Sequence, residues 1–344
     1  MLRLSPPCVA AAGLVIALLA IPAAARVLTL SYQSDTTAIV RDASDGNVAA
    51  SALTSAQGRL LIEAGVLAAD PDHDLVYVAA NADPAGPTAG TPAALLVNAY
   101  GSMPIPLGSV QAPVGRYFAA LAFDAPASRL VGIVADPTNI AVAQVFTVVT
   151  NSGASLGAPS YTDTLTGCCR FTSGIAAWRA PTQELLVIGR RSGDSEDQLL
   201  RFDFGVGTAL PDAYPITGGD QVVALAADPQ DASVYALARS VLGFTFLAKV
   251  TWSTPGTAAS LSPIGSAPAT CCYAAAGPAA IDGSGAARSL FALTRDAATP
   301  GPMQLSRFDF VSGNPVVVNT TMQGYGLWSD PSAMLDRIFA DGFD

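Results

Sequence analysis

Six short apolar runs, each ending at a turn, recur along the chain at a near-constant spacing. The first two are "VLAADPDHDLVYVAA", with Asp70 before the turn, and "ALAFDAPASRLVGIVA", with Asp124 in the same place. The series continues at Trp178, Asp228, Asp282 and Asp330, so successive spacings are 54, 54, 50, 54 and 48 residues. A fixed period of this length is typical of repeat folds, in which each supersecondary unit packs against the next.

Each repeat reads as four strands separated by turns. In the first, apolar or alternating segments cover residues 66–69, 75–80, 93–100 and 104–110, and Asp-Pro, Gly-Pro and Gly-Ser steps separate them. In the third strand of another repeat, "LLRFDF" (199–204), apolar and charged side chains alternate. The composition agrees, because Gly, Pro, Ser, Thr and Val abound while glutamate and lysine are scarce.

Four strands repeated radially form a β-propeller, which protects its sheet edges by that repetition. The sixth turn comes close to the end of the sequence, whereas "VLTLSYQ" and "TAIVRDA" offer spare strands before the first turn. The N-terminal strands should therefore complete the blade that the C-terminal strand begins. We expect an all-β, six-bladed propeller over residues 26–344, with both ends of the chain in the closing blade.

The residue pattern of "LAADPDHDLVYVAA" and "ALAADPQDASVYALA" resembles the six- and seven-bladed repeats of the YVTN, NHL and TolB-like proteins. The resemblance covers nearly all of residues 26–344 and implies the fold. It does not imply one activity, because those families include scaffolds, peptide binders, lactonases and cofactor enzymes.

The first 25 residues have the pattern of a secretory signal peptide. Arg3 precedes an apolar run from Val9 to Ile21, and the small residues of "PAAA" follow it. The run is too short to span a bilayer, so we expect a secreted, periplasmic or cell-surface protein without membrane insertion. A formal net charge of −10 argues against nucleic-acid partners.

Four cysteines form two adjacent pairs, Cys168–Cys169 and Cys271–Cys272, which occupy the same place in the third and fifth repeats. That place is the connection that enters a blade, near one mouth of the central channel. Four cysteines allow three pairings in an oxidising compartment. A bond between blades would need Cα atoms within about 7 Å, closer than equivalent points two blades apart normally lie, so bonds between neighbours are favoured.

Three interpretations of these pairs stay open: stiffening of tight turns, an apolar sulfur platform for a ligand, and a cross-blade or redox function. Around the same mouth the repeat places further candidate ligand-binding residues: Arg116, Tyr117, Arg170, Phe171, Asp220 and Tyr273. Loops between second and third strands should add Asp136, Arg190, Arg191 and Arg295. Arginine beside aromatic rings can hold a carboxylate or a sugar. The alternative is that these are ordinary solvated loop residues.

The sequence favours no catalytic residue, metal site or cofactor. His73 is the only histidine, and it falls in a turn on the face opposite the cysteines. A Ser-His-Asp triad or a histidine-ligated metal would need an imidazole in a pocket. The repeated aspartates are interpreted as turn residues whose side chains bind nearby backbone N–H groups.

The sequence thus predicts a secreted propeller that binds or scaffolds a protein, glycan or small molecule through its cysteine-bearing face. The alternative is an extracytoplasmic propeller enzyme, either a calcium-assisted lactonase or a quinone-dependent dehydrogenase.

Overall fold

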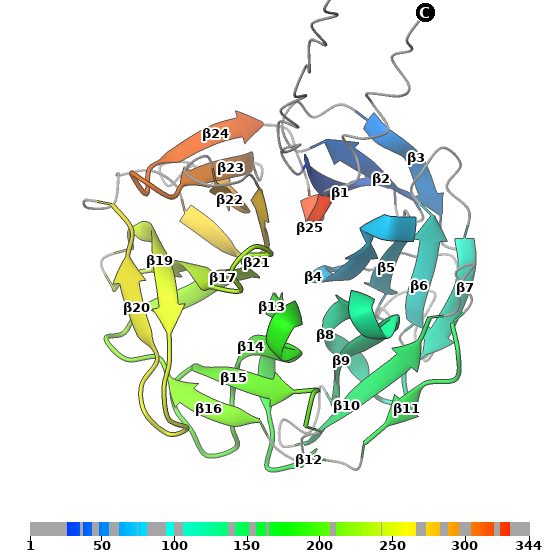
Figure 1. Ribbon diagram of the computed structural model, residues 1–344, viewed down its shortest axis with the longest axis horizontal. Coiled ribbons are helices and arrows are strands. Elements are labelled where there is room, and N and C mark those ends of the chain that lie inside the picture. Colours follow the sequence, from blue (N-terminus) through cyan, green and yellow to red (C-terminus); the bar gives the residue numbers. More distant parts are fainter. Residues whose placement is uncertain are drawn as a thin grey trace, which may run out of the picture.

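The computed structural model describes residues 26–34, 37–42, 48–54, 62–73, 75–80, 94–99, 106–136, 142–150, 156–162, 165–206, 211–241, 243–265, 273–282, 288–295, 304–319 and 324–330. Their strands form six antiparallel sheets arranged round one axis (Figure 1). The predicted all-β propeller is confirmed.

Each sheet is a blade, and its innermost strand, nearest the axis, is β4, β8, β13, β17, β21 or β25 in turn. Blade 1 contains β4 (Ile62–Asp70), β5 (Leu75–Ala80), β6 (Ala94–Ala99) and β7 (Pro106–Gln111). Blade 2 contains β8 (Tyr117–Asp124), β9 (Arg129–Ala135), β10 (Val142–Val149) and an outer strand in two pieces, β11 (Ser160–Tyr161) and β12 (Leu165–Thr166). Blade 3 contains β13 (Arg170–Arg179), β14 (Glu184–Arg190), β15 (Gln198–Asp203) and β16 (Asp212–Pro215).

Blades 4 and 5 repeat this order. Blade 4 contains β17 (Gln221–Ala227), β18 (Val234–Arg239), β19 (Thr245–Thr251) and β20 (Ser260–Pro263). Blade 5 contains β21 (Tyr273–Asp282), β22 (Ser289–Arg295), β23 (Gln304–Asp309) and β24 (Pro315–Asn319). Three short 3₁₀ turns, η1 (Pro71–His73), η2 (Ala125–Ala127) and η3 (Ala180–Thr182), follow the inner strands of blades 1 to 3.

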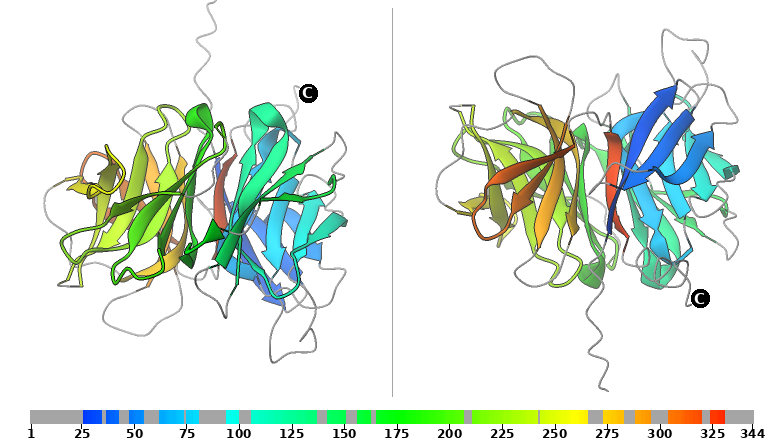
Figure 2. Two further views of the ribbon diagram at one scale, coloured as in Figure 1. Left: turned by 90° about the horizontal axis from the view of Figure 1, so that it is seen from below. Right: turned by 90° about the horizontal axis from the view of Figure 1, so that it is seen from above.

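Both ends of the described chain contribute to blade 6. Its strands lie in the order β25 (Gly324–Asp330), β1 (Arg26–Ser34), β2 (Thr37–Asp42) and β3 (Val48–Thr54). Arg26 pairs with Asp330 and Leu28 with Trp328 along the antiparallel register of β1 and β25. The side views show β25, in red, beside the blue β1 (Figure 2). The sharing of the closing blade agrees with the sequence analysis.

Each blade packs a face against the next blade through apolar side chains. One buried cluster joins β5 and β8 of blades 1 and 2, and others join blades 2 and 3, 3 and 4, and 4 and 5. Because a blade has neighbours on both sides, middle strands such as β14 are buried on both faces. Leu199 and Leu200 of β15 are therefore both buried although adjacent residues point to opposite faces.

The inner strands of alternate blades carry wide bulges. Four residues of β4, 63–66, lie against Ala79 alone, and β13 and β21 repeat this offset at residues 172–175 and 275–278. The inner strands β8, β17 and β25 have only one extra residue each. The three widely bulged strands contact one another across the axis. They therefore narrow the centre of the propeller. Because wide and narrow bulges alternate from one blade to the next, the six inner strands have an approximate threefold pattern.

Two details differ from the sequence prediction. A third N-terminal strand, β3, completes blade 6, although its sequence "VAASALT" is rich in alanine and has weak strand character. In blade 3 the residue equivalent to Asp124 is Arg179, because both are paired with the first residue of the next strand and both precede a 3₁₀ turn. The assignment of that position to Trp178 was wrong by one residue.

The helical elements of the described residues lack the length and apolar character needed for a membrane-spanning helix.

Candidate ligand-binding face

The topology collects two kinds of loop on each face of the propeller. Inner strands start on the face that also carries the connections between second and third strands. We call this the cysteine face, because Cys168 and Cys169 directly precede β13. The turns between first and second strands, η1 to η3 among them, lie on the other side, which we call the turn face.

A disulfide joins Cys168 to Cys169, and the peptide bond between them is cis. This is the local pairing that the sequence favours for this pair. Cys271 and Cys272 lie outside the described residues.

The sulfur atoms of this pair are packed inside the protein. Cys168 and Cys169 are each 1% exposed and belong to the buried cluster between blades 2 and 3, which also contains Val145 of blade 2 and Leu200 of blade 3. The platform interpretation does not fit this pair in the structure, since no ligand can rest on a buried disulfide. The turn-stiffening interpretation fits, because the Cys168 N–H donates to the Leu165 carbonyl (3.2 Å) and Gly167 has φ +81°.

The turn also supports a neighbouring loop of the cysteine face. The Ser192 N–H donates to the Gly167 carbonyl at 3.1 Å, which ties the loop after β14 to the cysteine turn. The sequence "SGDSEDQ" (192–198) forms that loop. Its Asp194 accepts a hydrogen bond from Gln198 (2.8 Å), so the loop is braced from within.

The candidate residues lie at or beside the starts of inner strands. Tyr117, Arg170 and Tyr273 are the first residues of β8, β13 and β21, and Asp220 directly precedes β17. Tyr117 and Asp220 are half-buried. Tyr273 pairs along the backbone with Arg295, and the side chains of both lie outside the description.

Phe171 is buried rather than presented to solvent. It is 7% exposed, and its ring lies 6.3 Å from that of Phe202. It therefore contributes to the packing of blade 3, directly beside the wide bulge of β13.

The arginines of this face differ in how they are paired. Arg116 lies 3.4 Å from Asp136 (Nη1 to Oδ2), and Arg190 lies 2.7 Å from Asp197 (Nε to Oδ1). Arg191 donates to the Pro211 carbonyl. Arg170 is exposed and, within the described part of the chain, has no hydrogen-bond or ion-pair partner for its guanidinium.

Arg170 stands directly opposite Arg190 in the register of β13 and β14. Like charges at opposed positions of an antiparallel pair repel, because their Cβ atoms lie about 5 Å apart. Asp197 compensates Arg190, which leaves the charge of Arg170 available. The arrangement can hold an anionic group without rebuilding any described ion pair.

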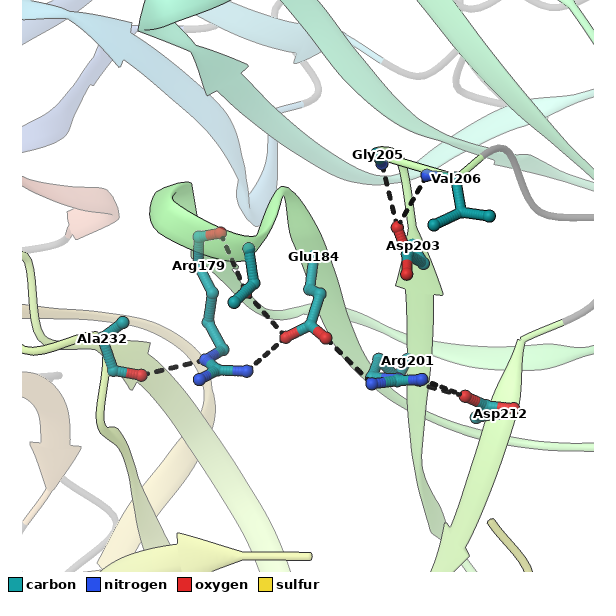
Figure 3. Close-up of polar contacts among 9 residues, drawn as sticks. Arg179, Glu184, Arg201, Asp203, Gly205, Val206, Asp212 and Ala232 are labelled. Carbon is teal, nitrogen blue, oxygen red and sulfur yellow. Dashed lines mark hydrogen bonds and ion pairs between the residues drawn. The ribbon is translucent and has the colours of Figure 1, made fainter. Parts of the chain in front are cut away.

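The turn face has a chain of ion pairs centred on one buried glutamate, which the sequence analysis missed. Glu184 is 5% exposed and binds Arg179 through one oxygen and Arg201 through the other (2.9 Å), and Arg201 also binds Asp212 (Figure 3). Arg179 further donates to the Ala232 carbonyl of blade 4 at 2.9 Å. These ion pairs and hydrogen bonds thus extend across blade 3 and end on blade 4.

The sequence contains a signal for this series of ion pairs. In blade 2, Asp124 faces Arg129 across the turn at 2.8 Å, and in blade 3, Arg179 faces Glu184 with the charges inverted. Both pairs are five residues apart across a 3₁₀ turn. A search for opposite charges at that spacing would have located it.

The repeated aspartates are held by different partners. Asp70 pairs with His73 and Asp124 with Arg129, each at 2.8 Å. Asp228 pairs with Arg288 and accepts from the Gln230 N–H (2.8 Å). The predicted bond to a turn N–H holds for Asp228, whereas Asp124 makes no such capping bond. Among the residues that the structure covers, no three His, Cys, Asp or Glu side chains gather as metal ligands.

Comparison with known proteins supports the fold. No protein-family model matches the chain, and no curated protein matches it in sequence. A solved structure of a putative TolB from Agrobacterium tumefaciens has a TM-score of 0.53 at 12% identity, covering 90% of this chain and 95% of that one. TolB from Acinetobacter baumannii has a TM-score of 0.52 at 11% identity, covering 89% of this chain and 66% of that one.

The periplasmic gluconolactonase of Pseudomonas aeruginosa is similar as well, with a TM-score of 0.51 at 13% identity over 86% of this chain and 82% of that one. At these identities the similarity shows a TolB-like and lactonase-like propeller fold, and function has to be argued from the site.

Proposed function

We propose that this protein is an exported β-propeller that binds a partner or ligand through its cysteine face. The observation that carries the proposal is Arg170, an exposed cation without a described partner, opposite a second arginine at the start of an inner strand. The ligand group that suits this position is an anion, such as a carboxylate of a protein, glycan or small molecule. Residues 26–344 would act as one binding domain.

Export is supported by the pattern of residues 1–25 and by the Cys168–Cys169 disulfide, since disulfides persist in oxidising compartments. One of the similar structures supports export by its name, which is that of a periplasmic gluconolactonase. N-terminal sequencing of the protein recovered outside the cytoplasm tests export, with Arg26 expected as the first residue.

Site-specific photo-crosslinking in the producing cells tests the binding face. A photoreactive residue is placed at Val114 or Thr217 on the cysteine face, and at the exposed Ala125 or Pro181 of the turn face as a control. We expect a discrete adduct from the cysteine face alone, and its loss when Arg170→Glu is added.

Adducts that form equally from both faces, or that survive Arg170→Glu, would contradict the proposal. If the purified protein hydrolyses gluconolactone in the presence of calcium, the enzyme alternative is favoured over the binding module.

A further inference from the structure

A pocket of about 280 Å³ lies between blades 3 and 4 at the turn face, remote from the proposed binding face. Arg179 contributes from blade 3, and blade 4 contributes residues 232–234 at and before the start of β18, residues 249–251 at the end of β19, and Trp252 just beyond it. The volume suits a ligand of the size of one sugar ring.

Trp252 is held in place by both blades. The Arg179 guanidinium carbon lies 5.2 Å from the centre of its ring, and the ring of Tyr214 in blade 3 lies 6.2 Å away. The loop after Trp252 crosses to the outer edge of blade 3, where the Gly256 N–H donates to the Ala213 carbonyl (2.9 Å). The indole is therefore a fixed wall of the pocket.

Arg179 is fixed too, yet it retains donors. Its Nε donates to the Ala232 carbonyl and its Nη1 to Glu184, as Figure 3 shows. A guanidinium has five N–H donors, and within the described residues Nη2 makes no such bond. A donor group that is already oriented binds a ligand oxygen with little further loss of side-chain entropy.

The charges that line the pocket are all positive. Arg179 and Lys249, the only lysine of the chain, line it together with the hydroxyl-bearing Ser233 and Thr251, and among the described residues no acidic side chain does. The ion-pair chain of Arg179, Glu184, Arg201 and Asp212 is neutral as a whole, so the net positive charge at the pocket comes from Lys249, while Arg179 contributes oriented N–H donors. In a protein of net charge −10, such a lining favours an anionic ligand.

We propose that this pocket binds a small carboxylate with a hydroxylated, ring-sized body, that is, a molecule of the sugar-acid class. The carboxylate would bind the cationic side of the pocket, and the ring would pack against Trp252. The hydroxyls of Ser233 and Thr251 suit the hydroxyl groups of such a ligand. The inference does not depend on the proposed function of the cysteine face.

Calorimetric titration with sodium glucuronate, and with glucose and sodium acetate as partial analogues, tests this assignment. We expect saturable glucuronate binding, with each analogue at least about fivefold weaker, because each lacks one half of the recognised chemistry. Lys249→Gln should weaken glucuronate at least about fivefold and leave glucose unchanged. Lys249 is exposed, so this variant should fold normally.

Two controls separate the sites. Arg170→Ala, on the other face, should leave glucuronate binding unchanged, so a failure of the proposed function would not affect this result. Trp252→Phe should abolish any glucuronate-dependent change in fluorescence, although Trp178 and Trp328 remain. The assignment is overturned if glucuronate does not bind, if glucose or acetate binds equally well, or if Lys249→Gln binds glucuronate as the unaltered protein does.

Discussion

At the scale of single residues, Asp309 illustrates how this protein uses its many aspartates. One carboxylate oxygen accepts hydrogen bonds from the N–H groups of Val311 (3.0 Å) and Ser312 (2.7 Å) and from the Ser312 hydroxyl (2.9 Å). The bond from the Ser312 backbone is the main reason that the pKa of Asp309 lies below its usual value. These bonds hold the turn between β23 and β24.

Because the folded-state pKa of Asp309 is lowered, its stabilising effect is present above the unfolded pKa of about 4 and is lost as the pH falls through the folded value. Asp309→Ala should therefore reduce the free energy of unfolding by about 1 kcal/mol at pH 7 and by less at pH 3. Urea unfolding at both pH values measures this. A loss that is equal at both would show that the charge is irrelevant to the turn.

The buried disulfide gives a second prediction at this scale. Unfolded but unreduced protein should take up no alkylating label at Cys168 and Cys169, and peptide mapping would find the two residues bonded to each other. Since both are 1% exposed, reduction of the native protein should be much slower than that of the unfolded protein. Rapid labelling of either thiol in the native, unreduced protein would contradict the structure.

Position along the chain could be predicted at this scale, but burial could not. The repeat placed Arg170 and Tyr117 around the mouth beside the cysteine pairs, and in the structure they are the first residues of the inner strands β13 and β8. The buried state of Phe171 and of the disulfide depends on how blades 2 and 3 pack, which no local pattern contains. The displacement from Trp178 to Arg179 arose because the repeat was aligned by acidic residues, and blade 3 inverts the charge there.

At the scale of elements, the ion-pair chain of blade 3 should stabilise the fold through its buried member. Glu184 is bound by two arginines, so Glu184→Ala leaves Arg179 without a described carboxylate partner and removes one of the two partners of Arg201, and it should cost about 3 kcal/mol. Asp212 is 35% exposed at the outer strand, so Asp212→Ala should cost less than about 1 kcal/mol. Urea denaturation of the two variants compares them, and equal losses would refute this ranking.

The wide bulges give a second test at this scale. Gly174, in the bulge of β13, has φ +77°, a conformation that strains other residues. Gly277, in the bulge of β21, has no such φ, and an added Cβ would meet nothing within 4 Å. Gly174→Ala should cost about 1–2 kcal/mol and Gly277→Ala less than about 0.5 kcal/mol, as measured by thermal unfolding. The opposite order would contradict the geometry of the bulges.

The elements themselves were largely predictable, because turn residues and strand alternation repeat in every blade. The bulges were not identified in advance, although Gly65, Gly174 and Gly277 stand four or five residues before the turns of blades 1, 3 and 5. A glycine within a strand pattern is the known signal for a bulge. Their contact across the axis depends on three strands more than a hundred residues apart, which local patterns do not reveal.

At the scale of the whole molecule, the shared blade joins the two ends of the described chain. β25 is the inner strand of blade 6, pairs with β1, and contacts the inner strands β21 and β4 on either side. Each blade is stabilised mainly by its neighbours, so a ring that lacks one inner strand exposes apolar surface on both sides of the gap. Loss of β25 should therefore affect the whole ring and not blade 6 alone.

Two truncated chains separate this effect from simple shortening. A chain that ends before Gly324 lacks β25, whereas a chain that ends at Asp330 keeps it. The first should melt more than about 10 °C below the second, because the loss of several kcal/mol shifts the Tm of a domain of this size by that amount. Adding a synthetic peptide of residues 324–330 to the first chain should restore part of the lost stability, since the edge of β1 is then free to pair. If both truncated chains melt at the same temperature, closure by β25 does not stabilise the propeller.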